Sequence, residues 1–193
     1  MSLVDSYYQD LIRSTETITL LSALGSPLHH CGLEILEMIA SYLSDAATCE
    51  IRQDTVNQLA SMWYAHGWLA GGCFIGLIHV QEQPELLILP DDTIPPFQMN
   101  TLKEKTHRYQ QMLESALSAI TTAPAKGSPL AKGSDSIRTT VMSWLNLGKD
   151  HVKADELAAA LACYCFGYGL LDAAIRSGFF CMIHSYHLFT TEP

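Results

Sequence analysis

The chain has 193 residues, of which 48% are hydrophobic and only 16% are charged, and its formal net charge is −9. Such a low charged fraction indicates that the chain covers much of its surface, either internally or with a partner. Residues 1–100 carry two basic and 12 acidic side chains, whereas residues 101–193 carry nine basic and eight acidic ones. Because neither half has a lysine and arginine cluster that could contact phosphates, we expect no nucleic-acid partner.

Three helices are predicted in the first half. Apolar residues recur at steps of three and four over residues 4–24, which predicts an amphipathic helix that ends at Gly25. Ser26 is then a candidate cap for a second amphipathic helix over residues 27–47. A third helix is expected over residues 54–79.

The stretch 59–80 contains no Asp, Glu, Lys or Arg in 22 residues, which is long enough to span a bilayer. It contains two histidines and four glycines, however, and the segment that repeats it is interrupted by Asp172 and Arg176. A duplicated helix would not lie in lipid in one copy and in water in the other. An uncharged helix at the centre of a bundle accounts for both copies, so we expect no membrane partner.

Residues 80–100 contain four prolines, which break helices. We interpret this segment as an ordered, proline-rich linker between a first three-helix repeat, residues 1–79, and a second one, residues 101–193.

The second half is predicted to contain three further helices. The first covers residues 101–122, and a loop rich in Ala, Gly, Ser and Pro follows it. Because Gly133 and Ser134 belong to this loop, the next helix is expected only over residues 135–147. A long final helix is expected over residues 154–187.

The second half repeats the first at an offset of 102 residues. The motif Gly25-Ser26-Pro27-Leu28 aligns with Gly127-Ser128-Pro129-Leu130, and 12 of the 53 residues in 25–77 are identical to their mates in 127–179. A repeat of this kind predicts two similar supersecondary units, and short connections between helices predict antiparallel neighbours. We therefore expect an all-α fold, in which two tandem three-helix up-and-down units pack as one six-helix bundle.

Both predicted third helices contain small residues, which allow another backbone to approach closely. They are Ala60, Gly67, Gly71, Ala162, Gly169 and Ala173. We expect the two third helices to pack against each other near a pseudo-twofold axis.

The third helices also carry the segments Tyr64-Ala65-His66-Gly67-Trp68-Leu69 and Gly169-Leu170-Leu171-Asp172-Ala173, each followed by a glycine. They resemble the signature of a small archaeal helical family known as domain of unknown function 357, roughly Tyr-Ala-His-Gly-aromatic-Leu-Asp-Ala. The resemblance implies a three-helix unit in an archaeal cytosolic protein, and it implies no established activity, cofactor or catalytic residue. The two copies divide the motif, because Tyr168 replaces its histidine in the second copy and Ala70 replaces its aspartate in the first.

Aromatic and charged residues of the third helices could line a pocket between them, and these are our candidate ligand-binding residues: Trp63, His66, Trp68, Tyr168, Asp172 and Arg176. Two alternatives remain open. Asp172 and Arg176 have the i, i+4 spacing of a local ion pair, and His66 could be a hydrogen-bonded core residue among aromatic side chains.

The residues Cys181, His184 and His187 follow one another at steps of three, which would place them on adjacent turns of a helix as candidate metal ligands. The six cysteines show no CxxC spacing and are expected to be reduced core residues of a cytoplasmic protein. No glycine-rich phosphate loop or nucleophile elbow is present, so we expect no cofactor.

These patterns favour an interaction or scaffolding module without enzymatic activity, which binds a protein partner or forms a homodimer through its remaining apolar surface. The alternative is a small-molecule or metal-binding protein with a pocket between the two third helices. A closed cavity with converging polar groups would favour the alternative, and a packed centre with an apolar patch outside would favour the module.

Overall fold

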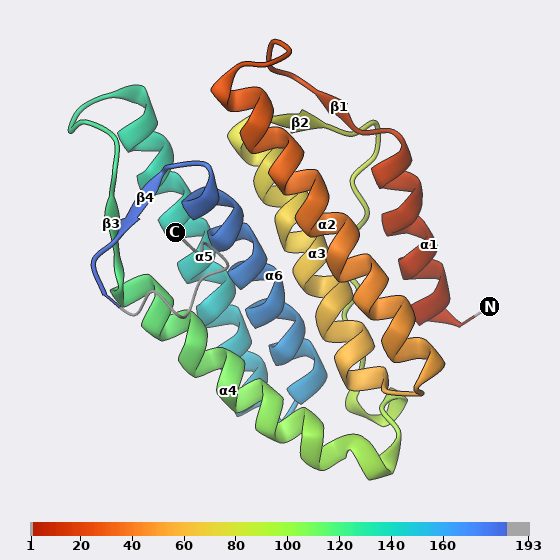
Figure 1. The fold of residues 1–193 in the computed structure, drawn as a ribbon. Coiled ribbons are helices and arrows are strands. Elements are labelled where there is room, and N and C mark those ends of the chain that lie inside the picture. Colours follow the sequence, from red (N-terminus) through yellow and green to blue (C-terminus); the bar gives the residue numbers. More distant parts are fainter. Residues whose placement is uncertain (1, 185–193) are drawn as a thin grey trace.

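The computed structural model describes residues 2–184 (Figure 1). It contains two copies of one unit, and the order of elements in each copy is helix, strand, helix, helix, strand. The first copy contains α1 (Leu3–Glu16), β1 (Thr19–Leu20), α2 (Pro27–Ile51), α3 (Thr55–Ile75) and β2 (Ile78–His79). The linker holds two short 3-10 helices, η1 (Asp91–Thr93) and η2 (Pro96–Gln98). The second copy contains α4 (Met99–Ser118), β3 (Ile120–Thr122), α5 (Pro129–Lys153), α6 (Leu157–Arg176) and β4 (Phe180–Met182). Together the helices form the all-α six-helix bundle expected from the sequence.

The long helices α2 and α5 begin in the same way in both copies. The hydroxyl of Ser26 accepts a hydrogen bond from the backbone N–H of His29, and Ser128 caps α5 through Ala131, each at 3.1 Å. A proline follows each serine at the first helical position, where its missing N–H costs nothing.

The prediction that α5 begins near residue 135 is therefore wrong, since the helix begins at Pro129. Gly133 and Ser134 lie inside it, next to Phe179. A β-carbon on Gly133 would lie 3.1 Å from the ring of Phe179, and the buried hydroxyl of Ser134 donates to the Phe179 carbonyl at 2.9 Å.

Each copy is closed by a two-stranded antiparallel sheet that the helical predictions missed. Strand β1 pairs with β2, and β3 pairs with β4. The predicted helices over 4–24 and 101–122 end early, at Glu16 and Ser118. Shortly after each of these two residues comes a run of β-branched residues, 17–19 and 120–122, which favours extended backbone.

The predicted third helices also end early, at Ile75 and Arg176, before β2 and β4. The following residues include Gly76 and Gly178, which have positive φ angles of 80° and 79°. Glycine adopts this conformation without the steric cost that other residues meet, so the chain can turn back into the strand.

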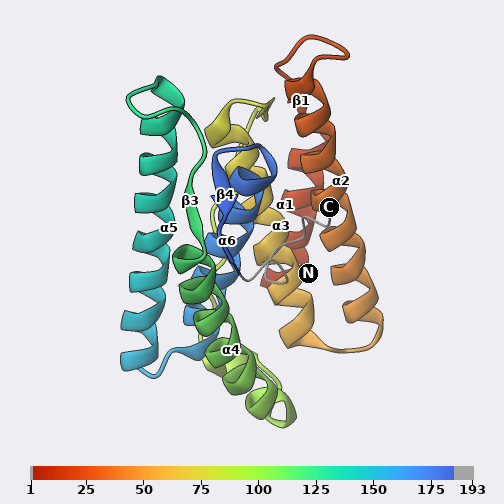
Figure 2. The same cartoon turned by 60° about the vertical axis from the view of Figure 1, so that its left-hand side comes forward.

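Helices α3 and α6 cross at the centre of the bundle, with α2 packed on α3 and α5 packed on α6 (Figures 1 and 2). Gly67 and Gly169 meet at the crossing. A β-carbon on Gly67 would lie 3.0 Å from the Cα of Gly169, and one on Gly169 would lie 3.1 Å from the Cα of Gly67. The two residues are 102 positions apart, so the crossing lies on the pseudo-twofold axis, as predicted.

The central pair is apolar because it is enclosed by the other helices. Of the described residues, only α6 has the length and composition to cross a membrane, and all of its most apolar window is buried inside the bundle. The core of a folded domain provides the same apolar surroundings as a bilayer for such a helix.

The linker packs against both copies. The carboxylate of Asp91 accepts hydrogen bonds from the first two backbone N–H groups of α6, on Leu157 and Ala158, at 3.0 and 2.7 Å. The side chain of Gln98 accepts from the N–H of Val56 at the start of α3, at 3.0 Å. The linker thus supplies a cap to each of the two central helices, whose first N–H groups have no partner within the helix.

Candidate functional site

Two aromatic clusters flank the crossing of α3 and α6, and the 102-residue offset relates them. The histidine cluster consists of His66, Phe166 and Trp144 together with Tyr7, and the tyrosine cluster consists of Tyr168, Tyr64, Tyr42 and Asp172. Ring centroids lie 4.7 Å apart for Trp144 and Phe166 and 4.4 Å apart for their mates Tyr42 and Tyr64. The His and Asp of the divided motif thus lie in two different clusters.

His66 is buried, with 3% of its surface exposed, and holds α1 and the linker to α3. Its Nδ1 lies 2.8 Å from the hydroxyl of Tyr7 on α1. A backbone hydrogen bond joins His66 to Pro84, which can only accept, so the imidazole donates there and Nδ1 accepts from Tyr7. This arrangement is the hydrogen-bonded core residue that the sequence left open as an alternative.

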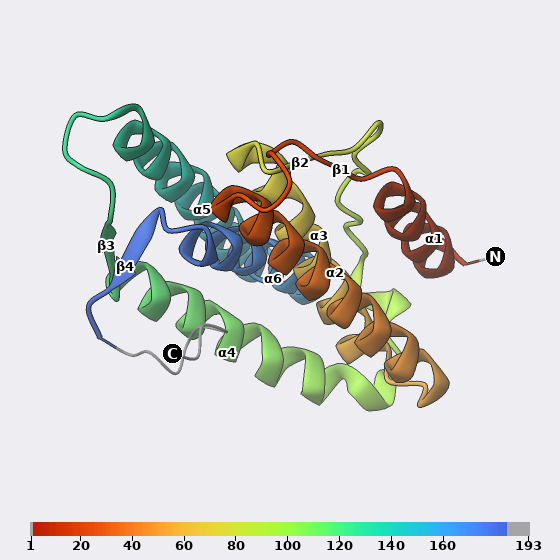
Figure 3. The ribbon, with the colours of Figure 1, turned by 45° about the horizontal axis from the view of Figure 1, so that its top comes forward.

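Neighbouring contacts hold the same part of the linker in place. The indole N–H of Trp63 donates to the carbonyl of Leu87 at 2.8 Å, and the hydroxyl of Ser14 donates to the carbonyl of Glu82 at 3.1 Å. Residues 82–87 therefore run between α1 and α3 (Figure 3). In the second copy, by contrast, α4 packs directly on α6, and the Thr106 hydroxyl donates to the Leu157 carbonyl at 3.2 Å.

The burial of His66 predicts a loss of stability in mild acid. Burial lowers the pKa of His66 to about 4, from about 6.5 in the unfolded chain. Between pH 6.5 and 4, His66 is therefore protonated in the unfolded chain and neutral in the folded protein. Its contribution to the free energy of unfolding is constant above pH 6.5 and falls as the pH falls towards 4. We expect His66 to account for a loss of about 3 kcal/mol across this window.

The measurement is urea denaturation at several pH values between 7 and 4, for the wild type and for His66→Gln. Glutamine can make both hydrogen bonds but does not titrate in this range. Between pH 7 and 4 the stability of the variant should therefore fall by about 3 kcal/mol less than that of the wild type. The carboxylates are common to both proteins and cancel in the comparison. Parallel pH profiles of the two proteins would contradict the assignment.

Asp172 is the buried carboxylate of the tyrosine cluster, with 1% of its surface exposed. It accepts a hydrogen bond from the hydroxyl of Tyr64 on the opposite central helix. Burial, and after it the charge of Asp172, raises the pKa of Tyr64 and raises that of Tyr42 to about 12. Both phenols thus keep their protons at neutral pH, and Tyr64 remains a donor to the carboxylate.

Two further candidate ligand-binding residues are Arg176, which forms an ion pair, and Trp68, which is buried. The guanidinium Nε of Arg176 lies 2.7 Å from a carboxylate oxygen of Glu34 on α2, which joins the two copies. The indole of Trp68 is buried, and its N–H has no hydrogen-bond partner within residues 2–184. At the level of Gly67 and Gly169 the backbones of α3 and α6 touch, so no pocket lies between them there. Farther along, a hollow of about 320 Å³ is lined by residues of both helices, among them Ala70 and Phe166, but by none of the six candidate ligand-binding residues.

The candidate metal ligands do not lie on one helix. Cys181 is exposed on strand β4, His184 follows that strand, and His187 lies outside the described residues. The described part of the chain holds no group of three His, Cys, Asp or Glu side chains arranged for a metal ion. All six cysteines are free thiols, and Cys181 departs from the expectation that they lie in the core.

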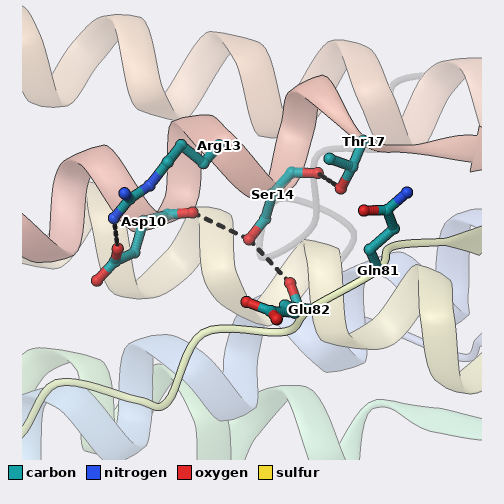
Figure 4. A pocket seen from close by; sticks show the side chains of 6 residues that line it. All are labelled: Asp10, Arg13, Ser14, Thr17, Gln81 and Glu82. Carbon is teal, nitrogen blue, oxygen red and sulfur yellow. Dashed lines mark hydrogen bonds and ion pairs between the residues drawn. The ribbon is translucent and has the colours of Figure 1, made fainter.

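One polar pocket, of about 290 Å³, lies where α1 approaches the start of the linker (Figure 4). The ion pair of Asp10 with Arg13 and the hydroxyl of Ser14 line it. The single O–H of that hydroxyl is shared between the carbonyls of Asp10 and Glu82, at 2.9 and 3.1 Å, so the polar groups at this pocket join the linker to α1.

A second hollow, of about 390 Å³, is an open apolar groove between α1 and α2, which we call the α1–α2 groove. Its lining is Tyr8, Ile12, Thr15, Ile18, Leu36, Ile39, Ala40, Leu43 and Ser44. Exposed acidic residues adjoin lining residues on both helices, namely Glu16, Glu37 and Asp45. The one basic residue of α1, Arg13, is paired with Asp10.

The corresponding place in the second copy is bridged by polar side chains. Lys149 of α5 forms an ion pair with Glu114 of α4 at 2.8 Å. Arg138 of α5 donates to the carbonyls of Leu117 and Ile120 at 3.2 and 3.3 Å. The residues at these three bridging positions in the first copy are Ala47, Ile12 and Leu36, which can make no such bridge.

Comparison with known families gives two matches along the chain. The sequence profile of a family described as "Protein of unknown function (DUF357)" matches residues 6–78 and again residues 108–180. These ranges are also offset by 102 residues and together cover well over half of the chain. The chain belongs to the DUF357 family. No curated protein and no solved structure matches it significantly.

The family matches therefore agree with the tandem duplication seen in the fold, and they bring no activity to the chain. Sequence reasoning missed the α1–α2 groove, although the repeat contained a signal for it. Aligning the two copies shows that Ile12 and Leu36 replace the charged residues Glu114 and Arg138. Charged residues that are present in one copy of a duplicated unit and absent from the matching positions of the other indicate a surface that differs between the copies.

Proposed function

We propose that this member of the DUF357 family is an interaction module, which binds an amphipathic helix of a protein partner in the α1–α2 groove. The observation that supports the proposal is the difference between the copies. The groove is open and apolar in the first copy, whereas an ion pair and an arginine bridge the same place in the second. An apolar groove along two helices suits the apolar stripe of a third helix.

The charge around the groove favours a partner helix with basic flanks. Residues 1–100 carry 12 acidic and only two basic side chains, and on both helices an exposed acidic residue follows a lining residue in the sequence. Two copies of this chain would bring two acidic faces together, which opposes self-association through the groove. A helix with leucines on one face and lysines beside them would satisfy both the apolar lining and the acidic rim.

The test is a titration of the protein with a synthetic helical peptide that has leucines on one face and lysines on the others. Binding is monitored by amide NMR shifts of the protein and by fluorescence anisotropy of the peptide. Shifts should concentrate on α1 and α2. The triple variant Ile12→Glu, Leu36→Arg, Ala47→Lys gives the first copy the bridging residues of the second, and it should bind at least about tenfold more weakly, a loss of 1.4 kcal/mol or more.

Met142→Arg is the matched control, because Met142 is the exposed mate of the lining residue Ala40 in the second copy. It adds a positive charge away from the groove and should bind like the wild type. Equal binding by the triple variant and the wild type, or shifts spread evenly over the acidic surface, would contradict the proposal.

A further inference from the structure

Three exposed leucines project from one end of the molecule, on and beside the loop between β1 and α2. Leu24 is 90% exposed, Leu21 is 59% exposed, and Leu28 in the first turn of α2 is 57% exposed. The 17 residues from 17 to 33 around them include no Asp, Glu, Lys or Arg. An uncharged protrusion that exposes three leucines is unusual on a chain with net charge −9.

The loop has a defined turn that presents Leu24 outwards. The backbone N–H of Ser26 donates to the carbonyl of Ala23 at 3.0 Å, and Gly25 has a φ angle of 76°. Ser26 then caps α2. Because hydrogen bonds on both sides hold the turn, the exposure of Leu24 belongs to the folded structure.

The matching loop of the second copy lies at the same end of the bundle (Figures 1 and 2). That loop carries exposed Lys126, and the first turn of α5 after it carries exposed Leu130 and Lys132. Glu34, the acidic residue of α2 nearest this end, is paired with Arg176, and the next one, Glu37, is 11 residues from Ser26 along the chain, or about 16 Å along the helix. That separation exceeds the Debye length at physiological salt, so these acidic residues act little on the leucine-bearing end.

We propose that this end of the molecule binds the surface of a lipid bilayer with anionic headgroups, with Leu21, Leu24 and Leu28 inserted at the acyl boundary. The loop between β1 and α2, which forms this tip, stands out from the end of the bundle (Figures 1 and 2), so it fits a fluid layer that closes around it better than the flat face of a folded protein. Inserting residues 17–33 would remove no side-chain formal charge from water, apart from any on the two histidines, and Lys126 and Lys132 would face the headgroups.

This inference goes against the expectation of no membrane partner, which considered only a helix that spans the bilayer. Peripheral contact through a loop needs no such helix. It is also independent of the α1–α2 groove, since none of the three leucines lines that groove.

The test is flotation of the purified protein with vesicles of phosphatidylcholine, with and without phosphatidylserine. The wild type should float with the anionic vesicles. Leu21→Ser, Leu24→Ser should lower the bound fraction at least about fivefold, and Lys126→Glu, Lys132→Glu should lower it on anionic vesicles. Leu147→Ser, which removes an exposed leucine from α5, is the matched control and should float like the wild type.

Each other outcome would overturn the proposal. Absence of the wild type from both kinds of vesicle, or equal binding by the leucine double variant, would exclude membrane insertion of the tip. A wild-type dimer in solution that the same double variant dissociates, without flotation, would assign the leucines to contact between copies of the chain. The triple groove variant should float normally, which separates this test from that of the proposed function.

Discussion

Replacing Gly67 by alanine is expected to destabilise the fold by about 3 kcal/mol or more, because the added methyl group meets backbone. A β-carbon there would lie 3.0 Å from both the Cα of Gly169 and the N of Leu170, and it would clash with the carbonyl oxygen of Phe166. Backbone in the middle of α6 cannot move aside without disturbing the helices packed on it. A loss of this size is a large share of the 5–15 kcal/mol that typically stabilises a domain.

Gly169→Ala should cost a similar amount, since its β-carbon would meet the backbone of α3 at Gly67 and Trp68. The measurement is urea denaturation followed by far-UV circular dichroism. Gly133→Ala is the matched control, because its β-carbon would meet only the edge of the Phe179 ring, and alanine favours a helix by about 1 kcal/mol over glycine. Equal effects of Gly67→Ala and Gly133→Ala would show that the backbones do not meet closely at the crossing.

The second large effect is expected at the hydrogen bond between Tyr64 and Asp172. Tyr64→Phe removes a donor from a carboxylate that is 1% exposed and should cost about 2 to 3 kcal/mol. Asp172→Ala leaves a buried phenol without its acceptor and should cost about 2 kcal/mol. Both losses arise because the hydrogen bond between Tyr64 and Asp172 lies in the core, where water does not replace it.

The double variant Tyr64→Phe, Asp172→Ala should be more stable than the sum of the two losses predicts, by about 2 kcal/mol. The molecule already contains this apolar solution, because the mates of these residues are Phe166 and Ala70. Replacing both partners by apolar groups removes the unmatched polar atom. Stabilities from urea denaturation complete the cycle.

Tyr8→Phe is the matched control for the cycle. The Tyr8 hydroxyl is only half-buried and lies 3.4 Å from the carbonyl of Leu43, so its removal should change stability by about 0.5 kcal/mol or less. Strictly additive losses for Tyr64 and Asp172 would show that the two side chains do not depend on each other.

The divided motif explains why a site could not be assembled from the sequence. His66 and Asp172 occupy two different positions of one signature, each in a different copy, and the fold places them in different clusters. Trp63 and His66 are conspicuous in the sequence as aromatic and titratable residues in an apolar helix. Their partners, Leu87 and Pro84, lie on the linker, where no periodic pattern points to them.

The helix ends show where local patterns mislead. The step of three and four residues over 4–24 continues past Glu16, but residues 17–19 are all β-branched and the chain leaves the helix there. Gly133 and Ser134 are predicted to lie in the loop before α5, although they lie within the helix and face Phe179. A glycine that opens a turn and a glycine that permits close packing look the same in one sequence.

The amino-acid sequence by itself determined the tandem repeat, the six helices and the close approach of the two central ones. These properties follow from local periodicity, caps and small residues that recur 102 positions apart. Only the tertiary structure decided which side chains meet, since Tyr64 finds Asp172 across 108 residues and His66 finds Tyr7 across 59. It also decided that the first copy keeps an open groove, because a groove depends on how two helices are spaced and on which side chains bridge them.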